Sequence, residues 1–462
     1  MNTPLESIVR SFPKVIFTTK SLSIAPIATK VLGFVNLFRL CKNTRPASLF
    51  CQADWRSLQP PEAFMIDYQL RTRLIAGERS IERLGELARE LKGRRVLIVS
   101  DPGVVAAGIY QIGADQIRNA GLESVGFHDL AENPTTEHVR AGVQIAEEFR
   151  PDLLIGLGGG SSMDCAKGIN FIYSGGGKMS DYWGVGKATL PMLPMIAVPT
   201  TSGTGSETQS FALISDAHTH VKMACGDPKA SPAIAILDPL LTCSQPASVT
   251  ALTGIDALTH ALESFVTTKR NAISDCYARE AWTLLSRGFP RVLEDPMDLS
   301  GRSQMQLGAA FAGMAIEASM LGAAHALANP LTAYLNVPHG QAVGMMMPHV
   351  IRFNASFVGG RYGELVRLLP EIVPSDHRMA SEILADCFTR WLQLASMATG
   401  LEQLERWNAP QGASASAGGP CAAEELLEAM AKMAAKQWTG AFNPRPADAD
   451  DFLAIYRAAR SG

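Results

Sequence analysis

Four side chains in the second half of the chain are of types that together bind metal ions. Asp256 and His260 stand four residues apart in TGIDALTHALE, a spacing that places both on one face of a helix. His325 and His339 lie in an otherwise apolar run, GAAHALANPLTAYLNVPHG (322–340), and the VPHG pattern predicts that His339 begins a helix. Three imidazoles and one carboxylate are the ligands expected around divalent iron or zinc. Any one histidine could instead be a hydrogen-bonded core residue, but a shared metal would give all four groups a partner.

A glycine-rich stretch in the first half has the residues of a phosphate-binding loop. LLIGLGGGSSMDCAKGI (153–169) places Gly159 and Gly160 after an apolar run and Ser161 and Asp164 at the start of a predicted helix. Glycines allow close approach of the backbone, and a helix N-terminus offers unpaired N–H groups and a favourable dipole. The alternative is a tight turn in which Ser161 is only the N-cap of the helix.

Two further stretches favour a nucleotide site over a simple turn. VPTTSGTGSE follows another apolar run and supplies the hydroxyls of Thr200, Thr201 and Thr204, at the sheet edge where open α/β folds bind ligands. Asp101 ends the run VLIVS, where a carboxylate could accept hydrogen bonds from ribose hydroxyls and repel a 2′-phosphate. An aspartate at such a turn also occurs for local reasons, so both interpretations of Asp101 stay open.

The elements that must position these residues change character halfway along the chain. Short apolar runs that alternate with helical stretches predict a mainly parallel sheet, with strands in 94–100, 123–130, 151–158, 192–200 and 232–238. After the turn-rich DPLLTCSQPAS, apolar residues recur at helical spacing through most of the remainder. The predicted fold is therefore an α/β N-terminal nucleotide-binding domain with a parallel sheet, followed by an all-α C-terminal domain.

We place the domain boundaries where the composition changes. Residues 1–63 are predicted to form an N-terminal extension, loosely packed or targeting, 64–240 the α/β domain, and 241–462 the helical metal-binding domain. The low-complexity piece APQGASASAGGP (409–420) is predicted to be a surface loop between helices.

Composition limits the possible partners and compartments. A formal net charge of −3, with 18% charged residues, gives no long-range field for nucleic acid or an anionic membrane, so we expect neither as a partner. The eight cysteines are dispersed without a C-x-x-C pair in a long chain, which predicts reduced thiols and a cytoplasmic protein. The first 53 residues carry seven Lys or Arg and a single acid, Glu6, so organelle targeting remains an alternative for this segment.

Taken in order, the motifs GGGSSMD, PTTSGTGSE, TGIDALTHALE, GAAHALANPLTA and PHGQAVGMMMPHV resemble the iron-containing (group III) alcohol dehydrogenase family. The resemblance runs from about residue 66 to the end of the chain, including FNPRPADADDFLAIYRAA. It implies the dehydroquinate synthase-like, group III alcohol dehydrogenase fold, with the active site in the cleft between the two domains.

The resemblance also implies roles for individual residues. Asp256, His260, His325 and His339 match the metal ligands of the family. The positions that match its nucleotide contacts are Asp101, Asn133, Gly159, Gly160, Ser161, Asp164, Thr200, Thr201, Thr204 and Lys222. One position departs from the pattern, because many members carry a histidine where this chain has Asn329. Asparagine cannot relay a proton, so Asn329 is expected to bind the substrate or a water molecule instead.

The expected function is reversible hydride transfer between NAD, rather than NADP, and a small primary alcohol or aldehyde. The expected metal is Fe²⁺, with Zn²⁺ as the alternative, and the expected assembly is a homo-oligomer, specifically a dimer. One rival is a dehydroquinate synthase-like, NAD- and metal-dependent lyase, which needs a basic substrate pocket, whereas few Lys or Arg lie near the ligand motifs in 250–350. The other alternative is a non-catalytic relative of the enzyme. The complete set of four metal-ligand residues argues against it.

Overall fold

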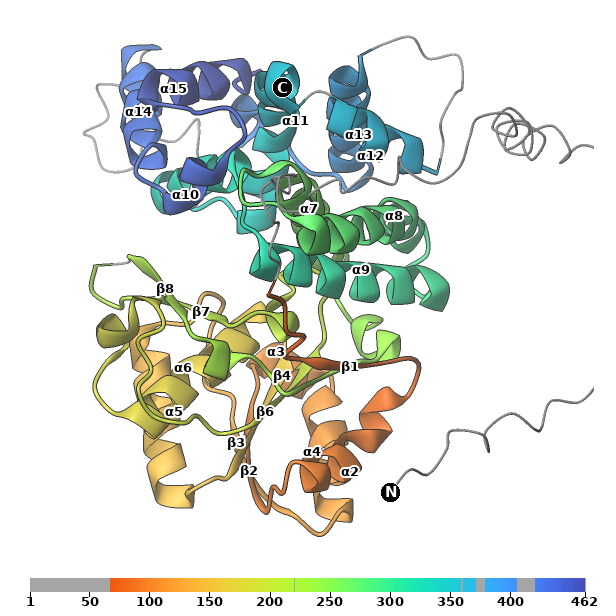
Figure 1. The fold of residues 1–462 in the computed structure, drawn as a ribbon, viewed down its shortest axis with the longest axis vertical. Helices are drawn as coiled ribbons and strands as arrows, with labels where there is room; N and C mark the ends of the chain where they lie inside the picture. Colours follow the sequence, from red (N-terminus) through yellow and green to blue (C-terminus); the bar gives the residue numbers. More distant parts are fainter. Residues whose placement is uncertain (1–66, 220, 359, 371–378, 405–419, 462) are drawn as a thin grey trace, which may run out of the picture. The chain divides into compact units, whose positions relative to one another are not determined.

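The computed structural model of the protein describes residues 67–219, 221–358, 360–370, 379–404 and 420–461. The predicted extension 1–63 and nearly all of the predicted loop 409–420 lie outside the described residues. From Tyr68 onward the chain forms a parallel sheet with its helices first and a run of helices afterwards (Figure 1). The boundaries at 240 and 241 stay predictions; the last strand of the sheet ends at Leu237 and the first long helix after it begins at Ala247.

The main sheet has six parallel strands in the order β1-β9-β6-β4-β2-β3. Five of them lie in the runs predicted as strands, and β1 is additional. Their bounds are β1 (Arg73–Ala76), β2 (Arg95–Val99), β3 (Glu123–Phe127), β4 (Leu153–Gly158), β6 (Met195–Pro199) and β9 (Ile234–Leu237).

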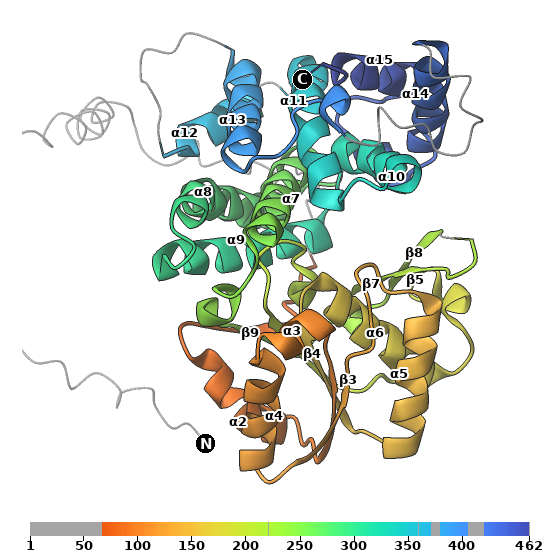
Figure 2. The same ribbon diagram turned by 180° about the vertical axis from the view of Figure 1, so that it is seen from behind.

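Helices cover both faces of this sheet, which explains why its inner strands are continuous apolar runs. In β2, Val96 and Ile98 pack with the helices of one side, and Leu97 and Val99 with those of the other. Figures 1 and 2 show α2 and α4 on one side and α5 and α6 on the opposite side. The helices are α2 (Leu84–Glu90), α3 (Pro102–Ala106), α4 (Ile109–Asn119), α5 (Thr136–Phe149) and α6 (Gly160–Gly175).

A second, three-stranded sheet was not predicted. Its order is β5-β8-β7, with β5 parallel and β7 antiparallel to β8. The strands are β5 (Gly184–Val185), β7 (Phe211–Ser215) and β8 (Lys222–Gly226). Short 3₁₀ turns connect these elements, at η1 (Ser80–Arg83), η2 (Met179–Tyr182), η3 (Ser206–Thr208), η4 (Pro228–Ala230) and η5 (Pro239–Thr242).

The second half is helical, as the apolar periodicity predicts. It contains α7 (Ala247–Val266), α8 (Ala272–Glu294), α9 (Leu299–Ala318), α10 (Ala323–Leu335), α11 (His339–Val358), α12 (Gly360–Leu368), α13 (Ala380–Leu394), α14 (Pro420–Ala434) and α15 (Ala449–Ala458), with turns η6 (Leu401–Gln403) and η8 (Trp438–Phe442).

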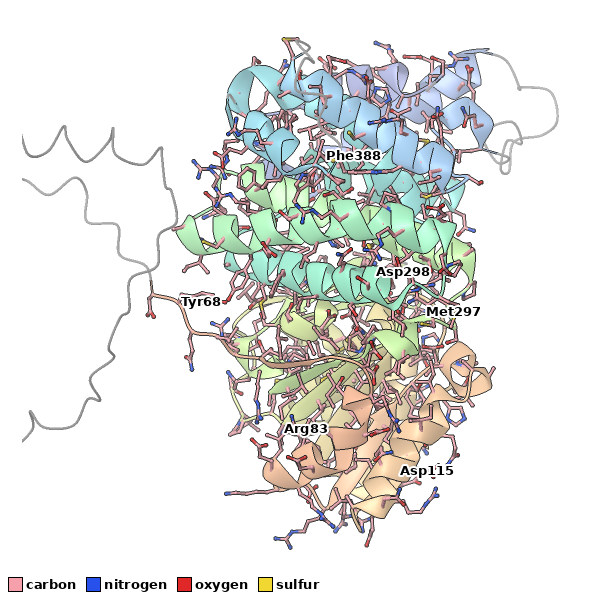
Figure 3. All side chains as sticks on the ribbon, turned by 90° about the vertical axis from the view of Figure 1, so that its right-hand side faces the viewer. Tyr68, Arg83, Asp115, Met297, Asp298 and Phe388 are labelled. Atoms are coloured by element: carbon pink, nitrogen blue, oxygen red, sulfur yellow. The ribbon has the colours of Figure 1, made fainter. Side chains whose placement is uncertain are left out.

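One hydrophobic core joins these helices. Phe388 of α13 is fully buried in it (Figure 3), and its ring lies 5.3 Å from that of Trp391 and 6.1 Å from that of Trp282 in α8. Helix α7 is buried along most of its length, so polar residues on it must be satisfied inside the protein.

In the described part of the chain no single helix has the length and hydropathy expected of a membrane span. One sharply bent pair of helices, α9 with α10, passes this test by length and composition only.

Candidate functional site

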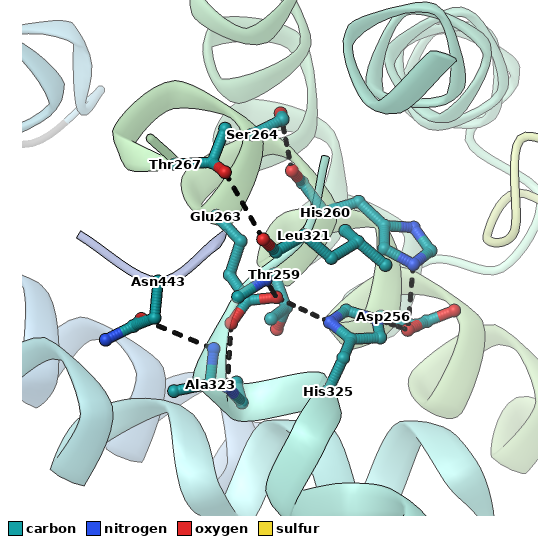
Figure 4. A network of polar contacts seen from close by, with 12 residues as sticks. Asp256, Thr259, His260, Glu263, Ser264, Thr267, Leu321, Ala323, His325 and Asn443 are labelled. Carbon is teal, nitrogen blue, oxygen red and sulfur yellow. Dashed lines mark hydrogen bonds and ion pairs between the residues drawn. The ribbon is translucent and has the colours of Figure 1, made fainter. Parts of the chain in front are cut away.

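Three helices bring the four predicted metal ligands together. Helix α7 carries Asp256 and His260, α10 carries His325, and α11 begins at His339 as predicted. The Nε2 atoms of His260, His325 and His339 lie 3.4, 3.5 and 3.8 Å from Asp256 Oδ1. Figure 4 shows the side chains of Asp256, His260 and His325 facing one another. One carboxylate oxygen is thus the common neighbour of three imidazole nitrogens.

This cluster has the spacing and the unsatisfied atoms that a shared cation requires. Ligand atoms placed tetrahedrally about 2.1 Å from one ion lie about 3.4 Å from each other. Asp256 Oδ1 and His325 Nε2 are buried without a hydrogen-bond partner among the described residues. Leaving such atoms unpaired is costly, and a cation bound between them removes the cost. The residues present therefore fit a divalent metal ion, with Asp256, His260 and His325 each offering one atom within 4.8 Å of the others.

The electrostatics of the cluster are those of a carboxylate among imidazoles. Burial raises the pKa of Asp256, but His260, His325 and His339 outweigh it and hold the pKa of this carboxyl well below its usual range. Burial lowers the pKa of His325, but the carboxylates of Glu263 and Asp256 outweigh it and raise this pKa to about 9. A cation that binds here at neutral pH must therefore compete with a proton on His325.

Glu263 is a further candidate site residue that the sequence analysis missed. Its Oε2 lies 2.6 Å from Nδ1 of His325, on the side of the ring opposite to Asp256. Glu263 belongs to the same TGIDALTHALE motif and lies seven residues after Asp256, two helical turns along one face of α7. That spacing was the signal available in the sequence.

The predicted phosphate loop joins β4 to α6. Gly158 ends the strand with φ +154°, and the helix begins at Gly160 with Gly159 as its N-cap. Ser161 therefore lies inside the first turn, so the alternative in which it caps the helix is wrong. The N-cap provides no side-chain hydrogen bond, which leaves N–H groups of this first turn available to an anion.

The threonine loop lies directly against the glycine loop. A Cβ on Gly159 would lie 3.3 Å from the Thr201 methyl group, and one on Gly160 would lie 2.6 Å from that of Thr204. Thr200 is buried and its backbone N–H donates to Gly158 O at 3.0 Å. The convergence of the two loops that the sequence predicts is present.

Two of the predicted nucleotide contacts have partners within the protein. Asp101 caps α3, since its Oδ1 accepts from Val104 N at 3.0 Å, and its Oδ2 accepts from Ser162 Oγ at 2.9 Å. Asp101 thus has the local, helix-capping role that the sequence left open. Both of its oxygens retain further lone pairs that could accept hydrogen bonds from a ribose. Asp164 turns inward, where it accepts from Ser206 Oγ at 2.6 Å and from Leu213 N at 3.2 Å. Asp164 holds the threonine loop and β7 against α6.

The remaining predicted contacts lie between the glycine loop and the metal cluster. Asn133, with φ +56°, donates its N–H to Ser161 Oγ at 3.3 Å and accepts from Lys222 Nζ at 3.1 Å. Lys222 is also close enough to Asp256 for their charges to interact. Lys222 is thus in contact with the predicted nucleotide loops through Asn133 and within electrostatic reach of the predicted metal cluster.

Asn329 lies one turn after His325 and is held by the C-terminal segment. Its Nδ2 donates to Gln437 Oε1 at 2.9 Å. The next residue, Trp438, is 46% exposed and stacks on Phe211 of β7 with ring centroids 6.3 Å apart. Gln437 and Trp438 were not predicted from the sequence, and they link the helical half to the second sheet.

Comparison with known proteins gives the same assignment over most of the chain. Residues 71–239 match the family described as iron-containing alcohol dehydrogenase, and residues 250–460 match the C-terminal region of the Fe-containing alcohol dehydrogenase family. The NAD-dependent methanol dehydrogenase of Bacillus methanolicus is 31% identical over 385 residues, 83% of this chain and 97% of that protein.

Solved structures of similar fold support the same family assignment. The crystal structure of a 1,3-propanediol oxidoreductase is similar with a TM-score of 0.79 at 30% identity, covering 86% of this chain and 100% of that one. Sulfoacetaldehyde reductase from Bifidobacterium kashiwanohense, solved with NAD⁺, has a TM-score of 0.75 at 26% identity and covers 86% of this chain and 99% of that one. These relatives support NAD and a divalent metal as cofactors and confirm the predicted fold class. The chain therefore belongs to the iron-containing alcohol dehydrogenase family, and the predicted function, an NAD-linked alcohol dehydrogenase or aldehyde reductase, is confirmed.

Proposed function

We propose that this enzyme interconverts small primary alcohols and their aldehydes with NAD, and that Fe²⁺ held by Asp256, His260, His325 and His339 is its metal. The observation that carries the proposal is the buried, unpaired Oδ1 of Asp256, which three imidazole nitrogens surround at 3.4 to 3.8 Å. A bound divalent cation supplies Lewis-acid polarisation of the substrate oxygen. Nicotinamide supplies the redox chemistry.

The residues of the chain bind and orient the cofactor. The first turn of α6 after Gly159 offers backbone N–H groups to the pyrophosphate, and Thr201 and Thr204 border the same space. Asp101, at the carboxyl end of β2, is placed to accept from ribose hydroxyls and to disfavour a 2′-phosphate. Lys222 donates to Asn133 and interacts electrostatically with both Asp164 of α6 and Asp256, which supports a cofactor site within reach of the metal cluster.

The surroundings of the cluster favour a small, uncharged substrate. Among the described ion pairs, those of Asp256 involve only histidines. Trp438 and Phe211 form an apolar contact beside Gln437, whose partner Asn329 is one turn from His325. Asn329 supplies an amide that can hydrogen-bond a hydroxyl or a water molecule. A phosphorylated sugar acid, the substrate type of the lyase alternative, would need more cationic side chains than Lys222.

The test is metal analysis combined with turnover. Protein purified without chelator is analysed for bound iron and zinc, then depleted and reloaded anaerobically with Fe²⁺ or Zn²⁺. We expect NADH oxidation with short aldehydes to disappear on depletion and to return best with Fe²⁺. Turnover that survives complete metal removal would overturn the proposed role of the cluster, and better recovery with Zn²⁺ would overturn only the choice of iron.

Three further proposals concern the protein as a whole. We propose a homodimer in the cytoplasm, with separate domains at 64–240 and 241–462. Dispersed cysteines support the reducing compartment. Light scattering of the purified enzyme tests the dimer, cell fractionation tests the location, and limited proteolysis near residue 240 tests the boundary.

A further inference from the structure

The first turn of α10, which carries His325, is held by side chains from two distant parts of the chain. Its N-cap, Gly322, offers no side-chain hydrogen bond. Instead Glu263 of α7 accepts from Gly322 N at 3.0 Å and from Ala324 N at 2.7 Å, and Asn443 accepts from Ala323 N at 3.3 Å. Figure 4 shows Glu263 and Asn443 on either side of Ala323. Three consecutive backbone donors are thus satisfied from outside the helix, as helix starts require.

Glu263 makes a further contact with the ring of His325. The distance between Oε2 and Nδ1 is 2.6 Å. Both oxygens of Glu263 already accept from backbone N–H groups, so the hydrogen of this contact is assigned to Nδ1. In the neutral imidazole that binds a metal ion, Nε2 is then the nitrogen with a free lone pair, and it is Nε2 that faces Asp256 Oδ1 at 3.5 Å.

Both carboxylate oxygens of Glu263 act as hydrogen-bond acceptors, Oε2 from Gly322 N and Oε1 from Ala324 N. The residue is only 2% exposed, and within the described part of the chain its one ion-pair partner is His325. A buried carboxylate without a full countercharge needs several donors. Two backbone N–H groups and the positive end of the α10 dipole provide them.

Asn443 serves the backbone of the turn and does not contact the imidazole. It forms a reciprocal pair with Asn354 of α11, at 3.0 and 2.7 Å, and its amide also donates to Arg445 O. His260 has no carboxylate behind its ring: the backbone of Gly203 lies near the imidazole, but its buried Nδ1 makes no hydrogen bond of good geometry among the described residues. Of these two imidazoles, His325 is therefore the one whose outer nitrogen contacts a carboxylate.

We propose that Glu263 is a positioning residue of the metal site, which fixes the orientation and the Nδ1–H tautomer of His325 so that Nε2 is available to the metal. This inference rests on the proposed function, because it requires that the cluster binds a metal ion. Outer hydrogen-bond partners of metal-bound histidines typically contribute 10–100-fold to metal affinity.

The decisive variant is Glu263→Gln, which keeps the size of the side chain and removes its charge. A glutamine amide can still accept one backbone N–H, but it cannot also accept from Nδ1 without leaving another donor unpaired. If its NH₂ group faces the ring, Nδ1 becomes the acceptor and Nε2 carries the hydrogen. We expect about a 10–100-fold loss of Co²⁺ affinity, measured by chelator competition on the full-length protein, and altered d–d absorption of bound Co²⁺.

The matched control is Glu317→Gln in α9. Glu317 also accepts from a backbone N–H, that of Ser210 at 3.0 Å, and from Ser210 Oγ at 2.7 Å, but it contacts no residue of the metal cluster. Glu317→Gln should lower the melting temperature of the apo protein about as much as Glu263→Gln does, while leaving the affinity for Co²⁺ and the absorption of bound Co²⁺ unchanged. Equal losses of affinity in both variants would reduce Glu263 to a general stabilising residue and overturn the inference.

A second measurement on the wild-type protein tests the inference even if Glu263→Gln does not fold. The ¹⁵N spectrum of Zn²⁺-loaded wild-type protein with labelled histidine, assigned by difference from His325→Gln, reports the two ring nitrogens directly. We expect metal-bound Nε2 and protonated Nδ1; an unprotonated Nδ1 overturns the inference. Failure of the wild-type protein to bind Co²⁺ or Zn²⁺ at all would refute the proposed metal site itself, which separates the two cases.

Discussion

At the scale of single residues, the proposed metal site depends more on Asp256 than on any other side chain. Its Oδ1 is the common neighbour of His260, His325 and His339. Asp256→Asn preserves the shape but removes the charge, so we expect loss of bound metal and at least about a 100-fold fall in kcat/KM, since Lewis-acid stabilisation is worth several kcal/mol. Metal analysis and NADH-linked assays measure both. The control is Asp115→Asn, at a partly exposed residue of α4, and an Asp256→Asn enzyme with full metal content would contradict the prediction.

Asp101 tests the choice between the two nicotinamide cofactors. Its carboxylate would repel a 2′-phosphate at the position that the ribose is expected to take. Asp101→Gly should shift the ratio of kcat/KM for NADPH over NADH upward by about tenfold, with only a few tenths of a kcal/mol lost at the N-cap of α3. Asp101→Asn, which keeps a capping oxygen, should show the same direction of change. A constant ratio in both variants would show that Asp101 serves only Val104 and Ser162.

Single residues were predictable from the sequence when their type and local spacing sufficed. Asp256 and His260 share one helix face, and the glycines and threonines follow apolar strands. Glu263, Gln437 and Asn443 were missed because their partners lie 59, 108 and 120 residues away along the chain. The spacing from Asp256 places Glu263 on the same helix face, but the contacts of all three residues depend on how the helices pack, which a local sequence pattern does not show.

At the scale of elements, the loop after β6 connects the proposed nucleotide site to the helical half. It touches the glycine loop through Thr201 and Thr204, and it then approaches α7, where a Cβ on Gly203 would lie 2.5 Å from Thr253. It also crosses α9, where Gly205, with φ +64°, packs against Gly313. Close packing of this kind transmits displacement from one half of the site to the other.

Gly313→Ala tests the packing of this loop on α9. An added Cβ would lie 2.5 Å from both Gly205 O and Thr208 Oγ1. The expected cost of overpacking, about 1–3 kcal/mol, exceeds the gain of up to about 1 kcal/mol in helix propensity. We therefore expect a lower free energy of unfolding and a higher KM for NADH, measured by denaturant titration and steady-state kinetics.

The control for this prediction is Gly363→Ala. Gly363 lies in α12, and the nearest atom to its Cβ would be an Arg367 nitrogen at 3.6 Å. Here helix propensity should dominate and stabilise the protein by about 0.5–1 kcal/mol. Destabilisation by both substitutions, or by neither, would show that the contact with the threonine loop is not what constrains Gly313.

Strands were predictable where burial on both faces of the sheet requires a continuous run of apolar residues. That condition holds for β2, β4, β6 and β9, and the periodic apolar pattern of the second half likewise predicts its helices. β1 and the second sheet were not predicted. RLIA of β1 is only four residues long and half exposed, and it is a strand because it pairs with β9, some 160 residues later. β5 has two residues and owes its existence to β8.

At the scale of the whole molecule, stability should depend on pH through Glu207. This residue of η3 is 2% exposed, and burial, partly opposed by hydrogen bonding to its own backbone, raises its pKa from 4.5 to about 7. Because the folded state binds this proton more tightly than the unfolded state, the stabilisation is complete below about pH 4.5 and is lost as pH rises through about 7. The total is about 3 kcal/mol, since one pKa unit corresponds to about 1.4 kcal/mol.

Glu207→Gln removes this titration without changing the size of the side chain. Unfolding free energies measured at pH 5 and pH 8 should therefore differ less in the variant than in the wild type, by up to about 3 kcal/mol. The exposed Glu148→Gln is the control and should behave as the wild type does. Parallel pH profiles of Glu207→Gln and wild type would refute the raised pKa.

Metal binding should stabilise the entire helical half, because the ligands come from three helices. Asp256 and His260 lie on α7, His325 on α10 and His339 on α11, and these helices share one core. A cation that binds only the folded state adds about 4 kcal/mol of stability at a free concentration 1,000 times its Kd. Fe²⁺ or Zn²⁺ should therefore raise the melting temperature of the apo protein in proportion to the logarithm of its concentration, and a chelator should reverse the shift. His339→Ala, which removes the ligand contributed by α11, should reduce the shift strongly, and a shift of unchanged size in that variant would place the stabilising metal elsewhere in the protein.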